Sequence, residues 1–199
     1  MGNWFPRLYD SFMSPLEKRP AFHTARKHLV AEAHGEVLEI GAGTGINFPF
    51  YTSSANHVLA TDPNLEMVKR MTFKKDKCAA PIEVQTANAE SLPFSDSSFD
   101  TVVGTLVFCS IPHPKIAIEE LNRVLKPGGK LLLFEHVKMD NPALQTTQDI
   151  LTPLWKHICD GCHLNRDTLS LIEHSTFNVN QVIPIYKGLF ISIKATKPI

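Results

Sequence analysis

Glu36-Val37-Leu38-Glu39-Ile40-Gly41-Ala42-Gly43-Thr44-Gly45, residues 36–45, is the stretch that decides the fold of this 199-residue chain. Its first half predicts a buried strand, and its second half is a glycine-rich turn. Glycine at 41, 43 and 45 lets the backbone adopt positive φ and pass close to a ligand, where a Cβ would clash. A strand that ends in such a turn, opening onto a helix N-terminus, is typical of a nucleotide-cofactor site.

The spacing of the glycines separates two classes of cofactor site. The dinucleotide fingerprint G-x-G-x-x-G requires glycine at position 46, where this chain has Ile46. The pattern G-x-G-x-G therefore disfavours a nicotinamide-dependent oxidoreductase, which stays as an alternative. A strand-to-helix turn can also need glycine for backbone geometry alone. The three glycines by themselves thus leave ligand binding open.

An acidic residue follows the second predicted strand. His57-Val58-Leu59-Ala60-Thr61 ends in Asp62, about one βαβ step after the glycine turn. A carboxylate at this place can accept both hydroxyls of a ribose. Pro63-Asn64 then begins a helix over residues 65–71, so Asp62 has an alternative role as a helix cap. The two roles are compatible, because a cap residue at the carboxyl end of a strand also faces the ligand crevice.

A third strand and the loop after it complete the pattern. Ile82-Glu83-Val84-Gln85 is followed by Thr86-Ala87-Asn88-Ala89-Glu90-Ser91-Leu92-Pro93-Phe94 and then by Ser98-Phe99-Asp100-Thr101-Val102-Val103. Together with the glycine turn and Asp62, these segments resemble the class I S-adenosylmethionine-dependent methyltransferases. The resemblance is to the small-molecule branch, which includes the quinone-ring methyltransferases.

The resemblance implies S-adenosyl-L-methionine as cofactor and S-adenosyl-L-homocysteine as product. It places the glycine turn along the methionine half, Asp62 on the ribose and the loop after the third strand on the adenine edge. Asn88 stands where the family usually has an aspartate, and its amide oxygen can still accept from the exocyclic amine. Tyr9 is expected over the cofactor carboxylate. The cofactor-binding residues implied in this way are Tyr9, Gly41, Ala42, Gly43, Gly45, Asn47, Asp62, Pro63, Met67, Asn88, Ala89, Glu90 and Leu106.

Alternating strand and helix patterns predict an α/β fold in one domain. A chain of 199 residues with 43% hydrophobic content can bury one doubly wound sheet. We expect a Rossmann-like domain with a mostly parallel seven-stranded sheet, an antiparallel C-terminal strand and helices on both faces. Residues 1–34 are expected to form an N-terminal helical lid segment, and residues 35–199 the core. Within the core we expect strands at 101–107 and 131–134, a helix at 115–125, and a hairpin of 179–186 with 189–196.

Composition and charge restrict the partners. The 20 basic and 20 acidic residues cancel, so there is no electrostatic drive toward nucleic acid, and a small-molecule acceptor is expected. The basic run over residues 69–77 is interpreted as a solvated face. No targeting signal or membrane-spanning run is visible, and the four cysteines are expected as reduced thiols, which favours a cytoplasmic location. Oligomeric state is left open.

The sequence Cys159-Asp160-Gly161-Cys162-His163 permits several roles. C-x-x-C-H is the attachment signature of c-type haem, which is disfavoured here because no export signal precedes it. A zinc site with Cys159, Cys162 and either His163 or His157 lacks a completing pair, so no metal is predicted. A redox dithiol stays open.

A narrower resemblance covers the same segment. Residues 153–166, 105–110, 47–51 and 134–137 are similar to the microsomal alkyl-thiol methyltransferases. Members of that group carry an N-terminal membrane-anchoring segment, which we expect this chain to lack. The resemblance implies a thiol as the first acceptor to test.

Methyl transfer depends mainly on positioning, and a thiol acceptor benefits from a nearby base. The predicted catalytic residues are Glu135, His136 and His157, with Cys109 and Asp160 as further candidates near the crevice. Each of them has a structural alternative, such as a backbone hydrogen bond for His136 or core packing for Cys109. Aromatic residues are expected to wall an apolar pocket or to pack the N-terminal helix, namely Trp4, Phe5, Tyr9, Phe12 and Trp155.

The sequence therefore predicts a methyltransferase that acts on a small, apolar acceptor. Besides the nicotinamide-dependent oxidoreductase, a non-catalytic cofactor-binding regulator stays as an alternative. A haem or metal protein is a further one.

Overall fold

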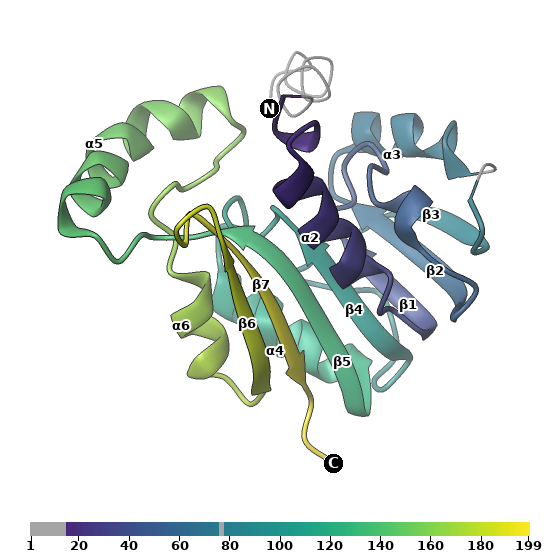
Figure 1. The fold of residues 1–199 in the computed structure, drawn as a ribbon. Coiled ribbons are helices and arrows are strands. Elements are labelled where there is room, and N and C mark those ends of the chain that lie inside the picture. The colour runs from purple at the N-terminus through teal and green to yellow at the C-terminus, as the bar shows by residue number, and fades with distance from the viewer. Residues whose placement is uncertain (1–14, 76–77) are drawn as a thin grey trace.

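Seven strands form one sheet in the order β3-β2-β1-β4-β5-β7-β6 (Figure 1). The computed structural model describes residues 15–75 and 78–199, so the predictions for Tyr9, Trp4, Phe5 and Phe12 lie outside the described residues. The strands are β1 (Gly35–Ile40), β2 (Ala55–Asp62), β3 (Ile82–Thr86), β4 (Phe99–Thr105), β5 (Leu125–His136), β6 (Asn178–Ile185) and β7 (Phe190–Thr196).

The pairing directions confirm the predicted topology. β1 pairs in parallel with β2 and β4, and further parallel pairs join β2 to β3 and β4 to β5. β7 runs antiparallel to both of its neighbours, β5 and β6. The strand order reverses between β1 and β4, and in such sheets ligands bind outside the carboxyl ends of the strands at this switch point. The glycine turn follows β1 at this place.

Two strands differ from their expected bounds for local reasons. β4 begins at Phe99 and ends at Thr105, because Leu106 has φ 54° and turns the chain out of the sheet. β5 begins at Leu125, directly after the preceding helix, because Leu125 already pairs with Phe99. The irregularity that contains Gly128, with φ 75°, lies inside the strand as a register shift.

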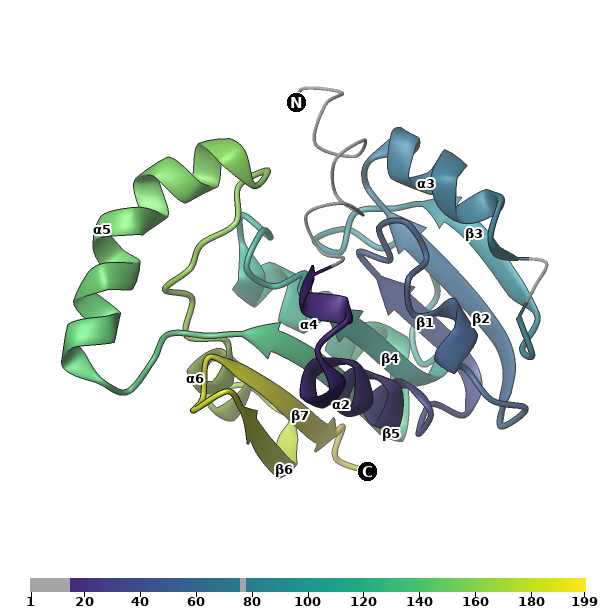
Figure 2. The same ribbon diagram turned by 45° about the horizontal axis from the view of Figure 1, so that its top comes forward.

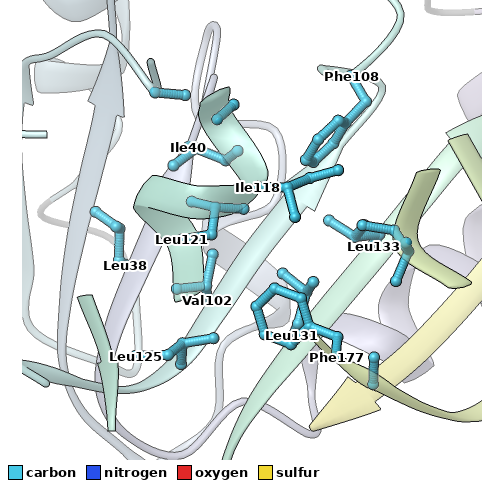
Figure 3. Packing of buried hydrophobic residues seen from close by; sticks show 14 of the residues in the cluster. Leu38, Ile40, Val102, Phe108, Ile118, Leu121, Leu125, Leu131, Leu133 and Phe177 are labelled. Carbon is cyan, nitrogen blue, oxygen red and sulfur yellow. The ribbon is translucent and has the colours of Figure 1, made fainter. Parts of the chain in front are cut away.

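Helices cover both faces of the sheet. α2 (Pro20–Val30) and α3 (Leu65–Thr72) contribute to one apolar cluster, and α4 (Pro114–Val124) and α6 (Thr168–Glu173) contribute to the other. Figure 3 shows the second cluster, in which Ile118 and Leu121 of α4 meet strand residues such as Val102. Alternate residues of β5 point to opposite faces, and Leu131, Leu132, Leu133 and Phe134 are all buried, as expected for a central strand.

α5 (Pro142–Ile158) stands apart from these layers, beyond the carboxyl end of β5 (Figures 1 and 2). Its attachment is polar. Gln148 is buried, accepts a hydrogen bond from the Met139 amide and donates to the carbonyls of Val137 and Leu164. Several aliphatic side chains of α5 are exposed, among them Ile150 and Leu154. Gln148 therefore ties α5 to the segment after β5 and to the segment before α6.

Among residues 15–75 and 78–199, none of the helices combines the length and the apolar character that a membrane crossing requires.

Leu121→Ala should destabilise the fold strongly. Leu121 is fully buried in the α4 cluster, and truncation of such a side chain costs about 2–5 kcal/mol because of lost burial and the cavity left behind. Ile116→Ala on the same helix is the matched control, since Ile116 is 46% exposed and its change should stay within about 0.5 kcal/mol. Urea unfolding followed by circular dichroism measures both. Equal effects of the two changes would contradict the assignment of the α4 face.

Candidate active site

The glycine turn has the backbone that its sequence requires. Gly41, Gly43 and Gly45 have φ of 58°, 57° and 74°. A Cβ on Gly41 would lie 2.2 Å from Cγ2 of Val107, and one on Gly45 would lie 2.6 Å from the ring of Phe48. Internal packing alone therefore accounts for glycine at 41 and 45. Their conformation is compatible with a ligand but does not demand one.

An expected helix after the turn is absent. The chain continues through turns into η1 (Phe48–Phe50), a short 3-10 helix, and Tyr51 then returns to extended backbone. The expectation of an α-helix N-terminus at this point is wrong, because Pro49 stands within this short turn and Tyr51 is buried against the sheet. Ligand binding at the turn thus depends on side chains and on backbone N–H groups of the loop.

Asp62 lies at the carboxyl end of β2 and connects two parts of the site. Its Oδ2 accepts from the Gly43 amide at 3.0 Å, and its Oδ1 accepts from the Asn64 amide at 2.8 Å. The N-cap of α3 is Asn64, whose side-chain oxygen accepts from the Glu66 amide. The alternative role of Asp62 as the helix cap is therefore wrong. Each carboxylate oxygen of Asp62 keeps a second lone pair for a ligand.

The pKa of Asp62 is also affected by a charge in the loop between α5 and α6. Burial raises its pKa above the ordinary value, two backbone hydrogen bonds lower it, and the negative charge of Asp160 raises it further. Asp160 has φ 46° in the Cys159–Cys162 turn. This loop therefore lies close enough to Asp62 for the two carboxylates to interact, although Asp62 and Asp160 are about 100 positions apart in the chain.

A buried carboxylate on β1 holds the glycine loop in place. Glu39 accepts from Asn47 Nδ2 at 2.7 Å and from the Tyr51 hydroxyl at 2.8 Å. Asn47 Nδ2 also donates to Thr105 Oγ1 on β4. Burial is the main cause that raises the pKa of Glu39 to about 7. The Nδ2 group of Asn47 thus donates to two acceptors. The Oδ1 atom of Asn47 is buried and has no hydrogen-bond partner among the described residues.

The loop after β3 uses its polar groups internally. Asn88 is exposed, and its Oδ1 accepts from the Glu90 amide. The Glu90 carboxylate accepts from the His113 amide at the start of α4, so this predicted cofactor residue also fixes a helix. Ala87 and Ala89 are buried between them. Asn88 keeps its Nδ2 and a second lone pair on its oxygen for an adenine-type edge.

The remaining predicted cofactor residues lie around the same edge of the sheet. Ala42 is buried and its amide donates to the Thr61 carbonyl. Met67 is buried on α3, while Pro63 is exposed just before that helix. Leu106, with its positive φ, donates its amide to the Phe134 carbonyl and so ties the β4 turn to β5.

Glu135 positions the turn after β4. It is fully buried, and its Oε1 accepts from the amides of Val107 and Phe108 at 2.9 and 3.1 Å. Its Oε2 is buried without a hydrogen-bond partner among the described residues. Burial is the main cause that raises its pKa to about 7, against the lowering effect of these hydrogen bonds. The hydrogen-bond partners of this predicted catalytic residue are therefore backbone amides.

The two predicted catalytic histidines lie in different surroundings. His136, the last residue of β5, has its Nε2 3.1 Å from Sγ of Cys162. His157 is exposed on α5, and its Nδ1 lies 2.8 Å from the Pro153 carbonyl, one turn earlier. The structure therefore places His136 at the carboxyl edge of the sheet, and His157 on the surface of α5.

The C-x-x-C-H segment does not bring Cys159, Cys162 and His163 together as one ligand group, as its spacing had suggested. Cys162 meets Cys109 and His136, with the three ligand atoms all within 4.8 Å of one another. His163 instead donates its amide to the Cys109 carbonyl, and Cys159 packs beside the group in a small cluster with Trp155 and Ile158. Sequence reasoning missed this group, because Cys109 and His136 were assigned to strand ends one at a time.

Two surface cavities lie beside this segment rather than over the glycine turn. One of about 620 Å³ is bordered by the start of α4 and by α6, and one of about 360 Å³ is bordered by α5. His163 and Asn165 line both. Neither is lined by the glycine turn or Asp62 among the described residues, so the cofactor site is located from the strand ends and not from cavity size.

Comparison with known proteins agrees with this arrangement. A family model described as a methyltransferase domain matches residues 38–133, which contain the glycine turn, Asp62 and β4. Thiol S-methyltransferase TMT1B of Rattus norvegicus is 40% identical over 150 residues, covering 73% of this chain and 61% of the relative. The Homo sapiens protein of the same name is 35% identical over 170 residues, covering 83% of this chain and 69% of the relative.

The chain belongs to the class I S-adenosylmethionine-dependent methyltransferases. The YcgJ protein of Bacillus subtilis has the same fold, with a TM-score of 0.73 at 20% identity over 89% of this chain and 99% of that one. Because the chain spans only 61–69% of the length of the two TMT1B relatives, their activity is carried over below as a proposal.

The residues present fit the cofactor of this methyltransferase family. The turn at residues 41–45 holds three glycines in positive φ, and Asp62 offers free lone pairs for hydroxyl donors. Asn47 Oδ1 is a buried acceptor near the turn with no hydrogen-bond partner among the described residues. An ammonium group has donors that could satisfy such an acceptor, and a buried acceptor without a donor costs about 1–3 kcal/mol.

Asp62→Ala should lower the affinity for S-adenosylhomocysteine about 10- to 100-fold, since hydrogen bonds to a charged group contribute roughly 1.5–3 kcal/mol. Asn64→Ala is the control. It removes only the α3 cap, so it should cost about 1 kcal/mol of stability and leave the affinity nearly unchanged. Isothermal titration calorimetry and urea unfolding measure the two quantities. An unchanged affinity of Asp62→Ala would show that Asp62 does not bind the ribose.

Glu39→Gln should flatten the dependence of stability on pH. The pKa of Glu39 is raised from the ordinary 4.5 to about 7 in the fold, so the protonated form is favoured there. Its stabilising contribution is full below pH 4.5 and is lost as pH rises toward 7. Unfolding free energies at several pH values should therefore fall less steeply in the variant. A slope in Glu39→Gln as steep as that of the unchanged chain would contradict the shift at Glu39.

Proposed function

We propose that this chain transfers the methyl group of S-adenosylmethionine to the sulfur of a small, apolar thiol. The observation that carries the proposal is the shared edge: the glycine turn, Asp62 and the Cys109–His136–Cys162 group all lie at the carboxyl ends of the parallel strands. The names of the TMT1B relatives support thiol methylation.

The bound cofactor supplies an activated electrophilic methyl group on its sulfonium, so the protein has mainly to orient the two reactants and keep water out. The turn at 41–45, Asn47 and Asp62 would hold the methionine and ribose parts, and the loop that contains Asn88 would lie at the adenine. The turn after β4, whose amides bind Glu135, brings Val107 against Gly41 of the glycine turn and leads on to Cys109.

An apolar acceptor is favoured by the surroundings of the crevice. Trp155 and Ile158 pack against the cysteines at the end of α5, and exposed aliphatic residues of the same helix continue the apolar surface. Glu135, His136 and His157 remain the proposed catalytic residues. Of these, His136 lies beside Cys162 at the end of β5, and Glu135 binds the amides of the turn after β4. His157 would have to leave its bond to Pro153 to take part.

Two other functions stay as alternatives. A non-catalytic regulator would bind the cofactor but methylate nothing, and a nicotinamide-dependent oxidoreductase is disfavoured by Ile46. The expected absence of nucleic-acid partners and the cytoplasmic location stay predictions, which electrophoretic mobility shift and cell fractionation would test.

Calorimetric titration with S-adenosylhomocysteine and with NAD decides the cofactor. We expect binding of the first and none of the second. Mass spectrometry then follows methylation in a panel of alkyl thiols, phenols, amines and quinols, with the alcohol of equal chain length as the control for each thiol. We expect methylated thiols and unchanged alcohols. Cofactor binding without any methylated product would favour the regulator, and NAD binding alone would overturn the proposal.

A further inference from the structure

Three potential metal ligands meet from three separate parts of the chain. Cys109 lies in the turn after β4, His136 ends β5, and Cys162 lies between α5 and α6. The two Sγ atoms and a ring nitrogen all lie within 4.8 Å of one another, and the His136 Nε2 to Cys162 Sγ distance is 3.1 Å. The cysteines are 3% and 8% exposed, so the group is closed to bulk water on most sides.

The separations suit tetrahedral zinc. With Zn–S of about 2.3 Å and Zn–N of about 2.0–2.1 Å, donor atoms lie roughly 3.5–3.8 Å apart. The separations found, none above 4.8 Å, need shifts of about 1 Å or less to reach these values. Two sulfurs and an imidazole form a soft donor set that selects zinc over magnesium or calcium. Three protein ligands also leave the fourth position open, as in catalytic rather than structural zinc sites.

The backbone around the ligands is held from both sides. Glu135 binds the amides of Val107 and Phe108 directly before Cys109. On the other side, the His163 amide donates to the Cys109 carbonyl at 2.8 Å, which joins the Cys162 segment to the β4 turn. Arg166 donates to the Ile111 carbonyl at 3.0 Å and reinforces the same junction. The ligands are therefore set by the fold and not by the flexibility of an open loop.

We propose that Cys109, His136 and Cys162 bind Zn²⁺ and that the fourth coordination position takes the sulfur of the acceptor. Zinc binding is inferred from the ligand group alone, which is the first half of the proposal. Binding of the acceptor sulfur, the second half, rests on the proposed thiol methylation. The neighbouring Val107 packs on Gly41 of the cofactor turn, and Asp160, two positions before Cys162, acts electrostatically on Asp62. The site thus borders the cofactor region.

Methyl transfer to a metal-bound thiol needs no oxidant or reductant. A free thiol has a pKa of about 8.5, and coordination to a metal deprotonates it. The proton passes to water, the thiolate sulfur forms a bond to the methyl carbon, and the bond between that carbon and the sulfonium sulfur breaks. The products are the methyl thioether and S-adenosylhomocysteine. The zinc site supplies the thiolate that a deprotonating side chain would otherwise have to generate.

Metal content of the protein purified without chelator, under a phosphine reductant, tests the first half. Inductively coupled plasma mass spectrometry should find about one Zn²⁺ per chain, retained on desalting. Cys162→Ser and His136→Ala should lose most of it. Cys159→Ser is the matched control, since Cys159 is equally buried in the same segment but stands outside the ligand group, and it should keep the metal.

Three results would overturn the zinc site. One is less than a tenth of a zinc per chain even after titration with ZnCl₂. Another is equal zinc in Cys162→Ser and the unchanged chain. The third is a Cys109–Cys162 disulfide found by peptide mapping in place of metal. Loss of zinc in Cys159→Ser would assign the fourth position to Cys159 and overturn the open coordination position.

Cobalt substitution tests the second half without an activity assay. The Co²⁺ protein should show sulfur-to-cobalt charge transfer in the near ultraviolet, which should grow when 1-butanethiol is added and stay unchanged with 1-butanol. A spectrum unaffected by the thiol would overturn acceptor binding to the metal. Calorimetry with S-adenosylhomocysteine on the same samples separates this failure from failure of the proposed function, because none of the proposed cofactor-binding residues is a ligand of the metal.

Discussion

Two buried carboxylates, one on each side of the switch point, hold the loops on which the site depends. Glu39 on β1 binds Asn47 and Tyr51 and so fixes the chain after the glycine turn. Glu135 at the end of β5 binds the amides of Val107 and Phe108 and so fixes the turn after β4. Isolated buried charges are costly, and burial raises the pKa of both groups to about 7. The fold retains them because each satisfies loop groups that would otherwise be unpaired.

The loops that these two carboxylates hold lie next to each other. The turn held by Glu135 contains Val107, which fills the space that a side chain on Gly41 would need. The same turn leads to Cys109, which meets His136 and Cys162. The proposed methyl donor and the proposed metal-bound acceptor would therefore share one edge of the sheet.

Much of the fold was predictable because its patterns are local. Apolar runs bounded by glycine and proline identified the central strands, and Lys187-Gly188 correctly indicated the hairpin of β6 and β7. The two wrong predictions about secondary structure also have causes in the local backbone. β4 ends two residues early because Leu106 adopts positive φ, and no α-helix follows the glycine turn, where Pro49 stands in a 3-10 turn. Neither conformation has a strong signal in residue type.

The sequence by itself determined the family and the fold class, and it placed Asp62 at the carboxyl end of β2, because these depend on residues that are close along the chain and follow strands of predictable direction. It could not pair Cys162 with Cys109 and His136, since these contacts depend on how the segment after α5 returns to the sheet. It also could not show that Asn64 rather than Asp62 caps α3, or that Glu135 binds backbone amides. Only the tertiary structure decided these points, because they depend on distances between groups that are separated by up to 53 positions in sequence.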